Sequence, residues 1–413
     1  MKKFFVKIIK LFRFNTAFKY AIELMLMVGL LALLLAVATQ DVTGGIIETI
    51  IGFLLSAMLL YAARIFINHF EDLLKINYDT ESLLRLYHGD ARYRKRLQLG
   101  DTSVEFAYAD NLINRGYRFE VVDDKDKMFE PDDFIMSNYE ALFSAHTGSA
   151  KTNGITVRLD RFELKDGLCT FYLSRSTYFN HLLTNRAMDF GLFEGISLRD
   201  VYEYGPLLSP LEKSKMSNHI GINALVFLSD GNLLLPRRKK DSTISKNKVT
   251  SSIAVKLNFP TDGRQEIDAH HLLYGNIIDN LSARTKIRPE DLSEADIEVE
   301  FLGFGQNIYE GGKPQLYYAV HLTAIDSERY LTMPKLGDNG TRLDVDKCIY
   351  VVRPQSFRIE RGLLAFEAVQ PHGKQKRLRL GYEMSYLCNL WHYEQSRLPQ
   401  AEDAAERTSE SLV

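Results

Sequence analysis

The pattern of apolar and polar positions divides the chain into a strongly apolar N-terminal part and a longer part with short apolar segments. Residues 20–39 and 46–67 are almost wholly apolar, and each is close to the roughly 20 residues that a helix needs to cross the hydrocarbon core of a bilayer. A signal peptide is the alternative for the first run, but a second run follows at once. We therefore expect two transmembrane helices within residues 20–70.

Basic residues around these two runs predict their orientation. Residues 1–19 mix lysines and an arginine with apolar side chains, which predicts an amphipathic helix on an anionic membrane surface, with an unstructured basic flank as the alternative. Arg64 and His69 lie at the end of the second run. Since basic residues flank both outer ends of the pair, the positive-inside rule predicts that both termini are cytoplasmic.

Within the second run, an acidic residue and small residues indicate a contact between helices. Glu48 lies about one turn from the outer end, and Gly52 and Ser56 follow at helical spacing. They predict a helix–helix interface or an oligomeric pore with Glu48 inside it. The alternative is that Glu48 reaches back to the outer surface, and the pattern leaves both open.

Short apolar segments separated by turn residues predict an α/β domain after the membrane part. Residues 223–228 and 232–235 flank Ser229-Asp230-Gly231, which has the chemistry of a hairpin turn. Further apolar segments predict strands at 118–122, 155–162, 168–173, 297–304, 315–324 and 349–352, and a helix at 378–394.

We divide the chain after the membrane part into four segments. Residues 71–100 are expected to form a helical linker, and residues 218–395 the core of the domain. Residues 101–217 are either a separate domain or an N-terminal part of the same sheet. Residues 396–413 are polar and are expected to be disordered.

Composition limits the chemistry that this domain can perform. The 413 residues include 51 Lys and Arg against 53 Asp and Glu, with a net charge of −2, so a general affinity for nucleic-acid polymers is not indicated. Cys169, Cys348 and Cys388 lie far apart without CxxC spacing, which predicts buried thiols and argues against a zinc site or a disulfide framework. Any basic site must therefore be local.

The donor-rich stretch behind the predicted hairpin is the candidate for an anion site. It offers guanidinium, ammonium and hydroxyl groups, which suit phosphate oxygens. We expect two arginines to contact phosphate, two lysines to add charge and two serines to give hydrogen bonds: Arg237, Arg238, Lys248, Lys256, Ser251 and Ser252. A solvated loop, or a contact with lipid headgroups, is the alternative.

Three other patterns have both a functional and a structural interpretation. Tyr178 to Arg186 is either part of a base-stacking pocket or, like other aromatic segments, part of the core. Gly303-Phe304-Gly305 lacks the helix and third glycine of a dinucleotide site, and adjacent His270 and His271 lack further metal ligands at suitable spacing. We therefore predict no cofactor and no metal.

The order of elements in residues 218–395 resembles a Nudix domain, with a hairpin ending in arginines, a loop, a helix ending at Ile287 and two strands. The family's box needs glutamates one turn apart, because their carboxylates hold the divalent ions that activate water. With Ile287 at the last box position, Ala283 and Arg284 replace the glutamate pair and Lys286 replaces the second glycine. Gln265, His271 and Asp279-Asn280 also depart from the box. The resemblance therefore implies a mixed sheet flanked by helices, without catalytic residues.

Two spans joined to a degenerate Nudix-like domain are similar to transmembrane effectors of bacterial cyclic-oligonucleotide (CBASS) antiphage systems. This resemblance implies a non-enzymatic effector in the bacterial inner membrane that binds a cyclic nucleotide or oligonucleotide messenger. Binding would drive homo-oligomerisation, membrane disruption and abortive infection. The alternatives are a membrane-tethered Nudix-type hydrolase of nucleoside diphosphate compounds and a non-enzymatic membrane scaffold.

Overall fold

A computed structural model describes residues 75–87, 91–146, 152–239, 247–337 and 348–398. The expected basic N-terminal segment, both expected transmembrane helices with Glu48, Gly52 and Ser56, and the tail from residue 399 lie outside the described residues. Among the helices that are described, none has both the length and the apolar character required to cross a membrane.

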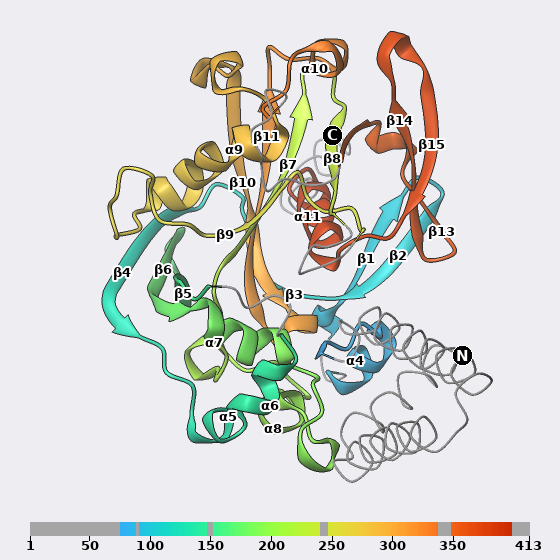
Figure 1. The fold of residues 1–413 in the computed structure, drawn as a ribbon. Helices are drawn as coiled ribbons and strands as arrows, with labels where there is room; N and C mark the ends of the chain where they lie inside the picture. The colour runs from blue at the N-terminus through green and yellow to red at the C-terminus, as the bar shows by residue number, and fades with distance from the viewer. Residues whose placement is uncertain (1–74, 88–90, 147–151, 240–246, 338–347, 399–413) are drawn as a thin grey trace, which may run out of the picture.

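A mixed sheet of ten strands, counted over the described residues, forms the centre of the fold (Figure 1). Its order is β13–β14–β12–β8–β7–β11–β10–β3, with β15 beside β14 and β9 beside β7. Strands β7 and β11 are parallel, and the other pairs described in this sheet are antiparallel. The expected α/β domain with a mixed sheet is therefore confirmed. The strands are β3 (Ala109–Ile113), β7 (Gly221–Leu228), β8 (Leu233–Arg237), β9 (Ile253–Lys256), β10 (Ile297–Asn307), β11 (Lys313–Leu322), β12 (Cys348–Val352), β13 (Arg358–Glu360), β14 (Leu363–Val369) and β15 (Gln375–Leu380).

The predicted hairpin is confirmed as β7 and β8. Phe227 pairs with Leu233 across the turn, in which Gly231 has a φ of 79° that glycine adopts at little cost. Every residue of β7 is buried, as expected of a central strand that is covered on both faces. The hairpin therefore lies in the middle of the sheet.

Each face of the large sheet carries its own hydrophobic core. On one face pack α9 (Asn276–Thr285) and a three-stranded sheet in the order β4–β6–β5, with Phe171 and Ile277 among the buried residues. On the other face pack α11 (Met384–Gln395) and a hairpin of β1 (Arg94–Leu99) and β2 (Thr102–Ala107), with Trp391 buried between them. Figure 1 shows these two layers on opposite sides of the large sheet. The strands of the small sheet are β4 (Arg118–Met128), β5 (Ile155–Lys165) and β6 (Leu168–Thr177).

Several short helices depend on their caps and on tertiary contacts, since helices of five to seven residues are unstable alone. The Asp132 side chain accepts from the Ile135 amide at the start of α5, and Ser197 and Asp200 form a capping box in α8. Helices α5, α6 and α8 gather at one end of the domain (Figure 1). The short helices are α4 (Thr80–Leu86), α5 (Asp133–Ser137), α6 (Tyr139–Ser144), α7 (Tyr178–Leu183), α8 (Leu198–Tyr202) and α10 (Ser327–Thr332).

Two of the predicted helices are wrong over part of their length. Within residues 71–100, α4 is helical but Arg94–Leu99 is strand β1, where Leu97 and Leu99 are buried and alternate with exposed Arg96 and Gln98. Within residues 378–394, Leu378 and Leu380 belong to β15 and alternate with exposed arginines. In both segments a period of two, typical of a strand, decides the structure.

The structure also shows how residues 101–217 relate to the rest. Strand β3 from this segment pairs with β10 and so belongs to the large sheet. Strands β4, β5 and β6 form a sheet of their own, tied to the core by Arg175, whose guanidinium donates to Asp123 and to the Gln265 carbonyl.

The glycines of the 303–305 segment serve close packing within β10. A Cβ at Gly305 would overlap the Tyr108 hydroxyl and the Ala109 carbonyl oxygen. Gly305→Ala is therefore expected to lower the free energy of unfolding by about 1–3 kcal/mol through overpacking. Thermal unfolding of the full chain in detergent, followed by Trp391 fluorescence, measures the loss. Gly154→Ala is the control, because no atom lies within 4 Å of its Cβ, and an equal loss in both variants would contradict the prediction.

Candidate functional site

A cavity of about 260 Å³ opens at the end of the large sheet where β7 and β11 begin. We call it the basic pocket. Its walls come from β7, β9, β11, α7 and the segments around Tyr78, Glu310 and Glu383. Its lining includes Tyr78, Tyr178, His181, Arg186, His219, Asn223, Arg238, Lys248, Lys256, Asn307, Tyr309, Glu310, Lys313, Gln315 and Glu383.

The floor of the basic pocket is a buried cluster of charges. Arg186 Nη1 lies 2.8 Å from Glu310 Oε1, and Lys313 Nζ lies 3.6 Å from Glu310 Oε2. Burial raises the pKa of Glu310, but the Lys313 ammonium and the Arg186 guanidinium outweigh burial and bring that pKa down to about 2. Burial lowers the pKa of Lys313, and Glu310 opposes that change. One carboxylate thus faces two cations, which leaves positive charge on the floor.

Two histidines stack beside this cluster. The rings of His181 and His219 lie 3.6 Å apart between centroids. Burial lowers both pKa values well below their usual range, and nearby cationic groups, including Lys313, lower them further. Both rings are therefore neutral near pH 7. Within the part of the chain that the structure describes, neither Nδ1 atom has a hydrogen-bond partner, and both atoms are buried beneath the pocket surface.

Further cations come from the loop behind the hairpin and from β9. Arg238 Nε lies 3.0 Å from Glu383 Oε1, and that pair is only partly exposed. Lys256 Nζ donates to the Ile155 carbonyl at 3.3 Å, and burial lowers the pKa of this lysine. Lys248 lines the same wall. These side chains approach the cavity from two different segments of the chain.

Tyrosines provide the aromatic surface of the basic pocket. Tyr78 and Tyr309 stack with centroids 6.1 Å apart, and Lys248 Nζ lies 5.1 Å from the centroid of the Tyr78 ring. The Tyr309 hydroxyl is 2.7 Å from Thr80 Oγ1, which fixes the ring. Tyr178 lines the pocket from the start of α7. Tyr309 is buried, whereas Tyr78 and Tyr178 are half-buried, and their rings can stack on a base or a sugar.

The overall charge of the lining is positive. Among the described residues that line the pocket, five cationic side chains accompany two carboxylates, and both carboxylates are already paired: Arg186, Arg238, Lys248, Lys256 and Lys313 with Glu310 and Glu383. Charge-assisted hydrogen bonds from such groups bind phosphate strongly. The arrangement therefore suits an anion that also carries an aromatic group.

The structure places three of the six predicted ligand-binding residues in this pocket, namely Arg238, Lys248 and Lys256. Arg237 points elsewhere, since its Nε donates to Asn247 Oδ1 at 2.9 Å and its Nη1 to the Tyr350 hydroxyl at 3.4 Å. Successive side chains of an extended segment point to opposite sides, which separates these two neighbouring arginines.

The two predicted serines lie in the core instead of lining the pocket. Ser251 Oγ accepts from Asn389 Nδ2 at 3.2 Å. Ser252 Oγ accepts from the Val226 amide at 2.9 Å and donates to the Leu234 carbonyl at 2.5 Å. Both hydroxyls therefore satisfy polar groups inside the fold.

The charged residues of the pocket floor, Arg186, Glu310 and Lys313, were not among the predicted site residues. Glu310 and Lys313 flank Gly311-Gly312, which the sequence marks only as a turn, and Arg186 belongs to the segment weighed for base stacking. One signal was present: Lys313 begins a strand in which nine of the ten residues are buried. A lysine in such a strand indicates either a paired charge or a functional one.

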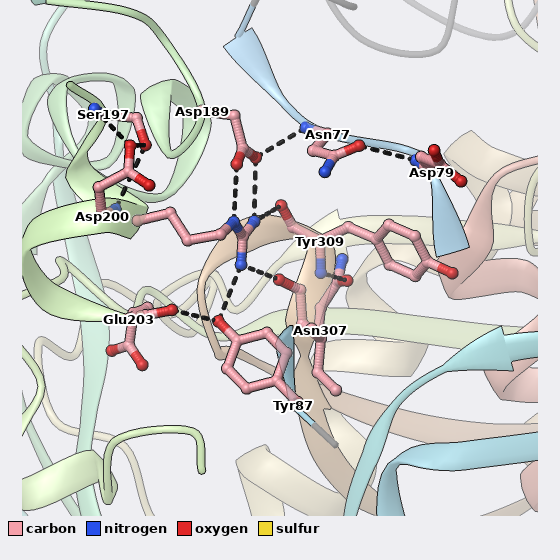
Figure 2. A network of polar contacts seen from close by, with 11 residues as sticks. Asn77, Asp79, Tyr87, Asp189, Ser197, Asp200, Glu203, Asn307 and Tyr309 are labelled. Atoms are coloured by element: carbon pink, nitrogen blue, oxygen red, sulfur yellow. Dashed lines mark hydrogen bonds and ion pairs between the residues drawn. The ribbon is translucent and has the colours of Figure 1, made fainter. Parts of the chain in front are cut away.

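A polar network joins the turn that carries Glu310 to the first described segment of the chain (Figure 2). Arg199 donates through Nε and Nη2 to the two Asp189 oxygens at 2.7 and 2.9 Å. It also donates to the Ile308 and Tyr309 carbonyls at 3.0 and 3.1 Å and to the Tyr87 hydroxyl at 3.0 Å. The turn behind the pocket is thereby fixed to α4 and α8.

The three cysteines and the adjacent pair His270 and His271 are not among the residues that line the basic pocket. Cys169 and Cys388 are buried as predicted, whereas Cys348 is half-buried. His271 Nε2 lies 2.9 Å from the Asn258 carbonyl oxygen, and His270 is exposed. Across the described ranges, no group of three or more His, Cys, Asp or Glu side chains could hold a metal ion.

The basic pocket is thus the site that the geometry favours, and its chemistry is that of anion binding with an aromatic wall. No protein-family model matches the chain, and no curated protein matches it either.

Proposed function

We propose that the chain is a membrane-anchored effector of bacterial antiphage defence that binds a cyclic nucleotide or oligonucleotide messenger in the basic pocket. Binding without hydrolysis drives oligomerisation and disruption of the inner membrane. The observation that carries this proposal is the basic pocket itself, where five cationic side chains and three tyrosines meet. Phosphate groups pair with the cations, and the nucleobases stack on the tyrosines.

The polar lining of the pocket favours a nucleotide over a simple anion. Asn223 and Gln315 lie on the neighbouring strands β7 and β11, and Asn223 Nδ2 donates to Gln315 Oε1 at 2.7 Å. Their remaining amide groups, together with neutral His181 and His219, can recognise the edge of a base. An inorganic anion would use the cations alone and leave this part of the pocket to water.

Features around α9 support a Nudix-like fold that has lost its catalytic groups. The order of β7, β8, α9, β10 and β11 is the order of elements on which the resemblance rests. Lys286, where the resemblance places the second glycine of the box, has a φ of 61° in the left-handed region that favours glycine. Ala283 and Arg284 stand where the family has its metal-binding glutamates, which supports binding without hydrolysis.

Calorimetric titration of the full chain in lipid nanodiscs with a panel of cyclic di- and trinucleotides tests the proposal. We expect saturable binding of at least one of them, recovery of that ligand unchanged and ligand-dependent dye leakage from vesicles. Absence of binding across the panel would contradict the sensor. Phosphate or nucleotide release from nucleoside diphosphate compounds with Mg²⁺ would instead support the hydrolase, and binding without any change in oligomeric size would support a scaffold.

Two adjacent arginines provide a matched test of the site. Arg238→Gln is expected to weaken binding of the best cyclic nucleotide about 10- to 100-fold, since a hydrogen bond to a charged group contributes about 1.5–3 kcal/mol. Arg237→Gln removes the same charge from the neighbouring residue, which bonds to Asn247 and Tyr350 outside the pocket. Calorimetry on both variants decides, and equal losses of affinity would assign the effect to overall charge instead of the pocket.

A further inference from the structure

Exposed apolar side chains are concentrated at the end of the domain that carries α5 and α8. Of the twelve large hydrophobic side chains that are exposed among the described residues, six lie in two short segments there. Phe193 is 83% exposed, Tyr204 66% and Leu207 51%, which is unusual for aromatic and aliphatic side chains. We call the six residues the apolar patch: Phe134, Met136, Phe193, Ile196, Tyr204 and Leu207.

The two segments belong to one surface. The Phe134 ring of α5 meets the Tyr202 ring of α8 edge-on, with centroids 6.1 Å apart. The Tyr202 hydroxyl donates to the Asp132 carboxylate at 2.6 Å. Helices α5 and α8 accordingly lie side by side in Figure 1. Met136 lies on α5 as well, and the other four patch residues flank α8 on both sides along the chain.

The same end of the domain receives the chain from its N-terminal part. The Asp189 amide donates to the Lys75 carbonyl at 2.8 Å, and Asp189 Oδ2 accepts from the Asn77 amide at 2.7 Å. Tyr87, at the end of α4, donates through its hydroxyl to the Glu203 carbonyl at 2.7 Å. The first described residues are therefore held against the segments on either side of α8.

The sequence before Lys75 sets a limit on the distance to the membrane. The predicted second span ends at residue 67, and eight residues of extended chain reach at most about 29 Å. Lys75 must then lie within that distance of the end of the span. The segments on either side of α8, which carry Phe193 and Tyr204, bond to the first described residues, so this limit keeps the apolar patch near the end of the predicted span.

Charge around the patch does not select an anionic surface. Arg85 on α4 is exposed, but so are Asp133 on α5 and Asp200 on α8. These opposite charges give little net attraction to anionic lipids. Aromatic and aliphatic side chains on a polar surface are, however, typical of contacts with the interfacial zone of a bilayer.

We infer that the apolar patch is a membrane-contact surface that sets the domain against the bilayer by insertion of Phe193, Tyr204 and their neighbours. This inference rests on the proposed membrane anchoring, and it adds a second point of attachment to the anchor. Two attachments restrict how the domain is oriented, so the basic pocket takes a defined position relative to the membrane.

Fluorescence quenching by spin-labelled lipids tests the contact. The full chain carrying Phe193→Cys, with Cys348→Ser to remove the half-buried thiol, is labelled with a small fluorophore and placed in neutral phosphatidylcholine vesicles. Leu164→Cys is the control, because Leu164 is 44% exposed and lies at the end of β5 away from α7. We expect at least twofold more quenching at position 193 than at position 164, unchanged in 0.5 M salt.

The outcomes separate this inference from the proposed function. Equal quenching at the two positions would overturn the inferred membrane contact. A label at position 193 that is shielded from both the lipid quencher and aqueous iodide would also overturn it, because such shielding would indicate a second copy of the chain on the patch. A chain that fails to float with vesicles would contradict the membrane anchor itself. Tyr204→Cys, on the other side of α8, provides an independent second position with the same expected result.

Discussion

Arg199→Met is expected to lower the free energy of unfolding by about 3–5 kcal/mol, because removal of one partner from a buried ion pair leaves the other charge uncompensated. Arg199 is 4% exposed at its side chain and Asp189 is 12% exposed. The substitution also removes the donors to the Ile308 and Tyr309 carbonyls. Methionine retains most of the apolar volume, so the loss reports the polar contacts and not a cavity.

Urea unfolding of the full chain in detergent, followed by Trp391 fluorescence, measures this loss as a lower midpoint. Arg264→Gln is the control. Arg264 pairs with Asp262 and Asp268, but all three side chains are more than half exposed, and solvent screens such pairs so that they contribute little to stability. A loss for Arg199→Met no larger than that of the control would show that the network in Figure 2 is dispensable for stability.

The same network explains why the segment from Lys75 to Tyr87 belongs to the domain. Its Asn77 amide and Tyr87 hydroxyl bond to Asp189 and to the Glu203 carbonyl, and Thr80 lies against the Tyr309 hydroxyl. Tyr78 from this segment also lines the basic pocket. Part of the basic pocket is therefore built from the residues that follow the predicted membrane spans.

Five strands of the large sheet, β7, β8, β10, β11 and β12, could be predicted because their signals are local, whereas β3, β9, β13, β14 and β15 were not predicted as strands. The hairpin needed only an apolar run on each side of Asp230-Gly231, and β10 and β11 are long runs around Gly311-Gly312. The choice of which strands pair with each other has no such local signal in the sequence. Nothing in the pattern of β3 indicates that it joins β10, which lies almost 190 residues farther along the chain. Tertiary contacts decide such pairings.

The site was predictable only where it lies on one continuous stretch. Lys248 and Lys256 follow the hairpin closely, and the stretch is rich in cations. The floor instead joins Arg186 to Glu310, which are 124 residues apart. Their contact depends on how α7 and the turn before β11 are placed, and a sequence without its fold does not contain that information. Arg237 was misplaced because charge alone does not tell on which side of the backbone a residue points.

The parent chain is expected to lose stability as the pH rises from 4.5 to about 7, and Glu203→Gln is expected to abolish that loss. Burial raises the pKa of Glu203 from 4.5 to about 7, although hydrogen bonds from Ser209 and the charge of Arg199 oppose the rise. The folded chain then keeps a proton that the unfolded chain releases above pH 4.5. Because the unfolded state binds fewer protons in this window, stability falls as the pH rises, by up to about 3 kcal/mol for this group.

Glutamine has the same shape and cannot ionise, and its carbonyl oxygen can still accept from the Ser209 amide, which lies 3.0 Å from Glu203 Oε2. The variant should therefore match the parent chain at pH 4.5 and exceed its stability by up to about 3 kcal/mol at pH 8. Urea unfolding at pH 4.5, 6 and 8 gives the difference between the two chains, in which the titration of all other groups cancels. Glu212→Gln, at an exposed carboxylate, is the control for the substitution itself. A difference for Glu203→Gln that stays constant with pH would mean that Glu203 has the same pKa in the folded and the unfolded chain, so that burial beside Arg199 does not hold its proton.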